Sequence, residues 1–231
     1  MTDLSILRFI SGALVLLTLG ACTASTAGSG GGPVPVATLK EPTSAEFSHP
    51  APERFDVLFE TSQGEFVVEV HRGWAPLGAE RFYNLVRAGY YDGLRFFRVI
   101  PGFVAQFGIH AEPGVNEAWR SFRIPDDPVV QPNRRGTLTF ATAGRDTRTV
   151  ELFLNLADNV HLDAYGFAPI GVVISGMDAV ERLFSGYGEG APRGQGPDQG
   201  RLQAEGEDYL SRDFPQLSRI LSARVVSSAG L

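Results

Sequence analysis

Two polar side chains, Arg98 and Gln106, interrupt an otherwise apolar run over residues 96–106. Pro101 and Gly102 divide this run, because proline fixes φ and glycine allows a bend, so two short strands are predicted. A guanidinium without a partner in a dry core is strongly unfavourable, whereas at the rim of an apolar cleft it can donate hydrogen bonds to a ligand. Arg98 is therefore either a core-strand residue that reaches solvent or a structural carboxylate, or a ligand-binding group at a cleft.

The segments around this run predict the elements that would position it. Strand-like residues 55–60 and 65–71 are separated by residues 62–64, which are typical of a tight hairpin turn. A helix is predicted to begin at Pro76 and to end at Gly89, because proline favours the first helical turn and glycine the C-terminal cap. The remaining predicted elements are strands at 136–143, 151–155, 167–174 and 220–226, and a helix at 176–184.

Many short strands, two amphipathic helices and long connections are typical of a mainly β fold that closes into a barrel. Residues 109–135 contain four prolines and no hydrophobic periodicity, so a loop is predicted there, and a second loop is predicted in the glycine-rich residues 186–206. The chain has 231 residues, of which 43% are hydrophobic, enough for one sizeable core.

Composition excludes several function classes. The net charge is −6 and no basic run occurs, which argues against a nucleic-acid partner. A single cysteine excludes an intramolecular disulfide and a cysteine-based metal cluster. No metal site is predicted, since the four histidines lack the spacing of metal ligands. The sequence contains no Gly-x-Ser-x-Gly motif, which argues against an α/β-hydrolase.

The N-terminus predicts export and a lipid anchor. Residues 1–21 read as a signal peptide, with Arg8 before an apolar run that is too short for a comfortable membrane span. The sequence Leu-Gly-Ala-Cys at its end resembles the bacterial lipoprotein box, which predicts lipidation of Cys22 with fatty acid such as palmitate. An ordinary signal peptide with a chance cysteine is the alternative. We expect a protein of the bacterial cell envelope, anchored to a membrane by lipid, with its domain in the periplasm.

Four segments are expected along the chain. Residues 1–21 form the signal peptide, and residues 22–53 form the lipidated cysteine with a flexible tether that is rich in small residues, glycine and proline. A globular domain occupies residues 54–226, and residues 227–231 form a C-terminal tail.

The segment Phe-Arg-Val-Ile-Pro-Gly-Phe-Val-Ala-Gln at residues 97–106 resembles the FHRVIPGFMxQ signature of cyclophilin-type peptidyl-prolyl cis-trans isomerases. The order of elements over residues 54–226 is also similar to that family. The resemblance implies a closed eight-stranded antiparallel β-barrel capped by two α-helices, with a substrate cleft on its outer face. It also implies isomerase activity on proline-containing polypeptides without a cofactor, and we expect a monomer.

The same resemblance assigns site residues. Arg98, Phe103 and Gln106 correspond to the catalytic arginine, the floor of the proline pocket and the family glutamine. The substrate-binding positions that it implies are Val104, Ala141, Thr142, Phe153, His161, Leu162 and Tyr165.

Several positions depart from the family pattern. Val104 stands in place of the usual methionine and Thr142 in place of asparagine. His161 occupies the position of the family tryptophan or of its bacterial alternatives phenylalanine, histidine and tyrosine. An extra residue places Tyr165 or Gly166 where the family has a pocket histidine. Thr-Val-Glu at residues 149–151 replaces Gly-Ser-Gln, and the residues 186–216 resemble an insertion of a bacterial branch. Weak binding of cyclosporin and reduced activity are therefore expected.

Isomerisation needs weakened amide resonance rather than a nucleophile, because the resonance imposes a barrier of about 20 kcal/mol. In the implied mechanism apolar side chains clamp the proline ring, and Arg98 donates towards the prolyl nitrogen as the amide twists. Two alternatives stay open: a cyclophilin-fold peptide-binding module or chaperone with little isomerase activity, and a scaffold that only positions partner proteins.

Overall fold

The computed structural model describes residues 33–226. The predicted signal peptide, the lipidation site Cys22, the first part of the tether and the C-terminal tail lie outside the described residues. Within residues 33–226, no helix combines the length and apolar character that a membrane crossing requires.

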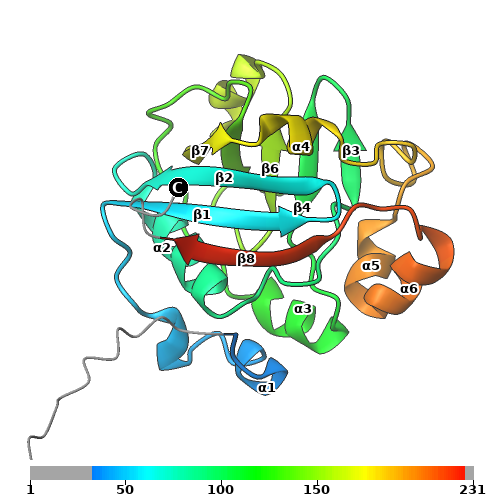
Figure 1. The fold of residues 1–231 in the computed structure, drawn as a ribbon. Helices are drawn as coiled ribbons and strands as arrows, with labels where there is room; N and C mark the ends of the chain where they lie inside the picture. The colour runs from blue at the N-terminus through cyan, green and yellow to red at the C-terminus, as the bar shows by residue number, and fades with distance from the viewer. Residues whose placement is uncertain (1–32, 227–231) are drawn as a thin grey trace, which may run out of the picture.

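A single antiparallel sheet of eight strands forms the body of the domain, in the order β3-β4-β6-β5-β7-β2-β1-β8 (Figure 1). The hairpin predicted near the start of the domain is β1 and β2, and the pair predicted around Pro101 is β3 and β4. The strand bounds are Arg54–Thr61 (β1), Gly64–His71 (β2), Arg98–Ile100 (β3), Val104–Phe107 (β4), Thr137–Phe140 (β5), Leu152–Asn155 (β6), Pro169–Ser175 (β7) and Ile220–Val226 (β8).

The sheet curls until its two outermost strands approach each other, but they do not pair along their length. A short bridge joins Arg95 to Arg219, flanked by hydrogen bonds from Phe96 N to Ser218 O at 3.0 Å and from Ile220 N to the carbonyl of the residue before Arg95 at 2.7 Å. Because β3 begins only at residue 98, the contact with β8 falls on the connection that precedes it. The predicted eight-stranded barrel is thus confirmed in outline. It is not fully closed, because the outermost strands β3 and β8 do not pair along their length.

Two helices occupy the positions that the sequence predicted. The helix α2 spans Pro76–Arg87 and is followed by Gly89, whose φ of +71° suits glycine at a C-terminal cap. The helix α4 spans Met177–Glu181. In Figure 1, α2 lies below β8 and α4 lies above β2, so the two helices flank opposite sides of the front strands.

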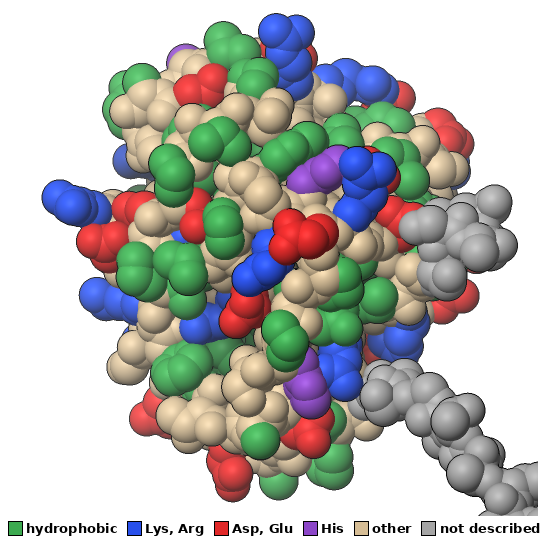
Figure 2. All heavy atoms as spheres, turned by 90° about the vertical axis from the view of Figure 1, so that its left-hand side faces the viewer, with side chains coloured by type: hydrophobic (Ala, Val, Ile, Leu, Met, Phe, Trp, Pro, Cys, Tyr) green, Lys and Arg blue, Asp and Glu red, His purple; other side chains and the backbone are tan. Residues whose placement is uncertain are grey.

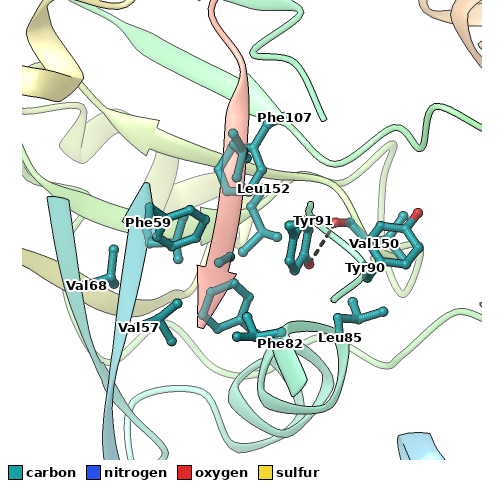
Figure 3. Packing of buried hydrophobic residues seen from close by; sticks show 14 of the residues in the cluster. Val57, Phe59, Val68, Phe82, Leu85, Tyr90, Tyr91, Phe107, Val150 and Leu152 are labelled. Carbon is teal, nitrogen blue, oxygen red and sulfur yellow. Dashed lines mark hydrogen bonds between the residues drawn. The ribbon is translucent and has the colours of Figure 1, made fainter. Parts of the chain in front are cut away.

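The core fills the interior of the curled sheet. Phe82 of α2 stacks on Phe59 of β1 with ring centroids 6.3 Å apart, Leu85 of α2 lies below Tyr90, and all four side chains are fully buried (Figure 3). Phe59 stacks on Phe66 of β2 with ring centroids 4.7 Å apart. Tyr91 follows α2 and donates from its hydroxyl to the carbonyl of residue 150 at 3.2 Å. Because the interior of the curled sheet is filled by side chains, a ligand can bind only on the outer surface of the sheet.

Both segments that the sequence assigned to long loops contain short helices. Within residues 109–135 lies α3, Pro113–Arg120, whose Val115 and Trp119 are buried. Within residues 186–216 lie α5 and α6, at Gln199–Glu205 and Glu207–Asp213. These helices bury only one or two apolar side chains each, which is too few to give a clear 3.6-residue pattern.

Residues 34–53 pack on the domain, which differs from the predicted flexible tether. Short helices form at Val36–Leu39 (α1) and Ala45–Phe47 (η1). The carbonyl of Leu39 accepts a hydrogen bond from the indole of Trp119 at 2.7 Å, and Leu39 is 4% exposed. Asn84 of α2 bonds both backbone groups of His49. A few long-range anchors therefore hold a segment whose composition alone is typical of a linker.

The face drawn in Figure 2 carries basic, acidic and hydrophobic side chains side by side, without a large area of one sign. Surface arginines in this domain are often paired, such as Arg72 with Glu53 at 2.8 Å. A mixed surface of this kind gives no electrostatic footprint for a nucleic-acid backbone on this face.

Candidate active site

The hairpin of β3 and β4 sets the position of the two polar residues in the apolar run. Arg98 pairs directly with Gln106 across the two strands, and Ile100 pairs with Val104. Gly102 makes the turn with a φ of +71°, and Phe103 N donates to Ile100 O at 3.0 Å. Because residues directly opposite in an antiparallel pair point to the same face, Arg98 and Gln106 lie side by side on it.

A surface cavity of about 610 Å³ lies over this face of the sheet. It has an apolar part, where Phe153 of β6 meets Phe167 edge to face with ring centroids 5.6 Å apart. Phe167 was not among the predicted site residues. The cavity is lined by the predicted Arg98, Phe103, Val104, Gln106, Ala141, Thr142, Phe153 and Leu162.

Two predicted substrate-binding residues do not line the cavity. His161 stacks beside Phe103 with ring centroids 6.2 Å apart, so it contacts the floor residue from outside. Tyr165 ends the short helix η2, Val160–Tyr165, and is 74% exposed. Gly166 follows with a φ of +83° and turns the chain, which leaves Tyr165 directed to solvent. The structure therefore does not bring Tyr165 or His161 into the lining of this cavity, and their substrate-binding role stays a prediction.

The guanidinium of Arg98 stands at the edge of the apolar part, with 18% of its side chain exposed. Its centre lies 5.6 Å from the ring centroid of Phe103. Nη1 donates to Gln106 Oε1 at 3.3 Å, while Nε and Nη2 donate to the two carboxylate oxygens of Glu189 at 2.6 and 2.7 Å. The two predictions for Arg98 thus both describe it: a carboxylate holds it, and it also lines a cleft.

Gln106 joins Arg98 to a second carboxylate in the cavity. Its Nε2 donates to Glu151 Oε2 at 3.1 Å, and Gln203 of α5 approaches the other oxygen at 3.5 Å. Burial raises the pKa of Glu151 from its ordinary value of 4.5 to about 6, although the two glutamine hydrogen bonds lower it. Glu151 therefore titrates close to neutral pH, next to Gln106.

The far part of the cavity is more polar. Thr142 shares a hydrogen bond with the Thr147 hydroxyl at 2.8 Å, and it accepts from Gly144 N at 3.1 Å, so its side chain stabilises its own loop. The hydroxyl of Thr142 is consequently committed to local contacts. Residues that the sequence did not single out also line the cavity: Asn116, Trp119, Arg120, Arg123, Thr147, Arg193 and Gln203.

Within residues 33–226 no group of three or more histidine, cysteine, aspartate or glutamate side chains is arranged to hold a metal ion. The site offers donors and acceptors beside an apolar slot. Such an arrangement can bind an apolar group and donate directed hydrogen bonds to a polar group beside it.

The sequence model described as "Cyclophilin type peptidyl-prolyl cis-trans isomerase/CLD" matches residues 56–198. Peptidyl-prolyl cis-trans isomerase A of Dickeya dadantii is 33% identical over 141 residues, covering 55% of this chain and 70% of that protein. A peptidyl-prolyl cis-trans isomerase of Acinetobacter baylyi is 35% identical over 133 residues, with the same two coverages of 55% and 70%.

A crystal structure of a cyclophilin-type isomerase from Cryptosporidium parvum superimposes with a TM-score of 0.56 at 19% identity, covering 76% of this chain and 99% of that chain. This likeness concerns the fold. The sequence match over more than half of the chain, together with the two bacterial relatives, goes further: this protein belongs to the family of cyclophilin-type peptidyl-prolyl cis-trans isomerases.

Proposed function

We propose that this protein accelerates rotation about X–Pro bonds in polypeptides by using Arg98 to stabilise the twisted amide. The observation that carries the proposal is the guanidinium at the rim of an apolar slot, directly opposite Gln106 on the β3–β4 hairpin. The proline ring would enter the slot between Phe103 and Phe153. The amide to be rotated would then lie beside Arg98.

Twisting the amide removes its resonance and concentrates a lone pair on the prolyl nitrogen. A hydrogen bond from Arg98 to that nitrogen is stronger in the twisted form than in either planar isomer, so it lowers the barrier selectively. Nη1 and Nη2 of Arg98 each carry a second N–H besides those bonded to Gln106 and Glu189. These two N–H groups are the donors available to a peptide.

An isomerisation assay on short X–Pro peptides, using the chain from Ala24 to Leu231, tests this function. We expect a rate of cis-to-trans conversion that rises in proportion to protein concentration. A folded protein that leaves the rate unchanged would contradict the proposal.

The second candidate is a peptide-binding module or chaperone that holds proline-containing segments with little isomerase activity. It is favoured by the ion pair of Arg98 with Glu189, which offsets the positive charge of the guanidinium. Measured binding of an X–Pro peptide without acceleration of its isomerisation would support this candidate over the first.

We further propose that the protein works in the bacterial cell envelope on exported polypeptides, lipid-anchored at Cys22. The support is the apolar segment that ends in Leu-Gly-Ala-Cys at residues 19–22. Metabolic labelling with palmitate should mark the parent chain and leave Cys22→Ala unlabelled. Equal labelling of both chains, or of neither, would refute the anchor.

A further inference from the structure

The loop that follows α4, residues 186–197, is built around the backbone of Glu189. The carbonyl of Glu189 accepts from Gly196 N at 2.8 Å, and Gly190 O accepts from Gly194 N at 3.1 Å. A Cβ atom at Gly194 would lie 2.2 Å from the Glu189 carbonyl oxygen, so only glycine fits there. This close packing fixes the main chain of Glu189.

The side chain of Glu189 is held at both of its oxygens. Oε1 accepts from Arg98 Nε at 2.6 Å and from Gly190 N at 2.8 Å, while Oε2 accepts from Arg98 Nη2 at 2.7 Å. Hydrogen bonding by Arg98 lowers the pKa of Glu189 below its ordinary value, which keeps the carboxylate ionised at neutral pH. A two-point bond of this kind fixes the plane of a guanidinium as well as its distance.

Glu189 meets Arg98 from outside the cavity. Arg98 lines the cavity, whereas Glu189 is not among the lining residues. The carboxylate binds the Nε side of the guanidinium and leaves the second N–H groups of Nη1 and Nη2 unbonded within residues 33–226. The contact therefore directs the guanidinium without filling the place of a substrate.

The insertion that carries Glu189 is anchored on the residues that lead directly into β3, the strand that carries Arg98. Phe97, next to Arg98, packs in a second apolar cluster with residues of α5, α6 and the following segment. Arg95, which is 7% exposed, donates from Nη2 to Glu207 of α6 at 2.5 Å. In Figure 1, α5 and α6 lie together beside the β3 end of the sheet. These contacts fix the position of the insertion relative to β3.

We infer that Glu189 is a positioning residue for the isomerase reaction: it clamps the Nε side of Arg98 so that the remaining N–H groups of Nη1 and Nη2 face the apolar slot. This inference rests on the proposed function of Arg98, and it gives the insertion at residues 186–216 a role in that function. A free arginine side chain samples many rotamers, and the clamp removes those that would point the donors away from the amide.

The opposite role, in which Glu189 blocks Arg98 until a substrate displaces it, makes an opposite prediction. A clamp raises kcat, so its removal lowers kcat with little effect on KM. If Glu189 instead blocks Arg98, it competes with the substrate for the guanidinium, so removal of Glu189 raises kcat/KM. The position of Glu189 outside the cavity lining favours the clamp.

The test compares Glu189→Ala with Glu189→Gln, because the glutamine oxygen can accept from only one of the two nitrogens. We expect kcat to fall about tenfold in Glu189→Ala and less in Glu189→Gln, with KM changed less than twofold. The matched control is Glu181→Gln, which removes a carboxylate that pairs with the exposed Arg135 outside the cavity. It should leave kcat and KM unchanged.

A double-mutant cycle and an NMR measurement separate the clamp from a structural effect. In the Arg98→Ala background, Glu189→Ala should have no further effect on kcat, because no guanidinium is left to position. Independently of activity, the Nε proton of Arg98 should exchange slowly with water in the parent and rapidly in Glu189→Ala.

Each failure has its own signature. If Arg98→Ala is inactive while Glu189→Ala matches the parent or exceeds it, the clamp is refuted and the function of Arg98 stands. If the parent itself does not accelerate isomerisation, the proposed function fails, and the Nε exchange rate still decides the clamp. Equal exchange in parent and Glu189→Ala would overturn it.

Discussion

Arg98 and Gln106 are direct cross-strand partners, and Arg98 Nη1 donates to Gln106 Oε1 at 3.3 Å. The amide of Gln106 is oriented in turn by Glu151, which accepts from its Nε2 at 3.1 Å. Polar groups thus continue from Glu189 through Arg98 and Gln106 to Glu151 along one rim of an apolar slot. Each member limits the orientation of the next.

Replacing Gln106 with alanine should lower kcat/KM about tenfold, because the Nη1 side of Arg98 loses its partner on the sheet. Peptide isomerisation kinetics measure the change, and circular dichroism checks that the fold is kept. A variant that folds and keeps the kcat/KM of the parent would show that Gln106 does not support Arg98.

Glu151→Gln should stabilise the domain at pH 7.5. Burial raises the pKa of Glu151 from 4.5 to about 6, so the folded state binds a proton more tightly than the unfolded state. The carboxyl therefore favours folding below pH 4.5, and this contribution is lost as the pH rises through about 6. The gain from the neutral glutamine is at most about 2 kcal/mol above that range and vanishes near pH 4.5.

Urea unfolding from pH 4.5 to 8 measures this difference between Glu151→Gln and the parent. The exposed Glu117 on α3 provides the control, since Glu117→Gln leaves the cavity untouched. A free-energy difference that stays constant across the pH range would rule out the titration of Glu151 as its cause.

Phe167→Ala should raise KM for X–Pro peptides about fivefold, because it removes the edge-to-face partner of Phe153 and opens the apolar slot, a loss of about 1 kcal/mol. Tyr165→Ala should leave KM unchanged, since Tyr165 is 74% exposed and does not line the cavity. If Tyr165→Ala raised KM and Phe167→Ala did not, Tyr165 would be the residue that contacts the substrate.

Trp119→Phe should lower the free energy of unfolding by about 1–2 kcal/mol, because the hydrogen bond from Trp119 Nε1 to Leu39 O is lost. The segment at residues 34–53 should then become sensitive to limited proteolysis before the rest of the domain. A segment that is cleaved equally fast in the parent would show that the hydrogen bond from Trp119 to Leu39 does not hold it.

The parts of the fold that the sequence predicts well are those with local causes. The β3–β4 hairpin follows from Pro101 and Gly102 within the apolar run, and α2 follows from Pro76, an apolar stripe and Gly89. The positions of Arg98, Phe103, Gln106 and Phe153 around one cavity agree with the assignment by family resemblance.

The parts that the sequence did not predict depend on contacts between distant segments. Glu189 is 91 residues from Arg98 and lies in a glycine-rich loop, where no sequence pattern predicts its contact with Arg98. Trp119 reaches Leu39 across 80 residues. The family resemblance, with one inserted residue, predicts Tyr165 at the pocket, but the turn at Gly166 leaves its side chain exposed to solvent. No local pattern encodes such pairings.

The value of kcat/KM for Arg98→Ala on an X–Pro peptide decides whether Arg98 accelerates isomerisation from the rim of the slot. Arg98→Lys should also be impaired, because an ammonium cannot reproduce the guanidinium fork. Arg145→Ala, at a side chain 91% exposed and outside the cavity lining, is the matched control. We expect kcat/KM to fall about 100-fold or more in Arg98→Ala and to stay at the parental value in the control. Parental activity in a folded Arg98→Ala variant would contradict it.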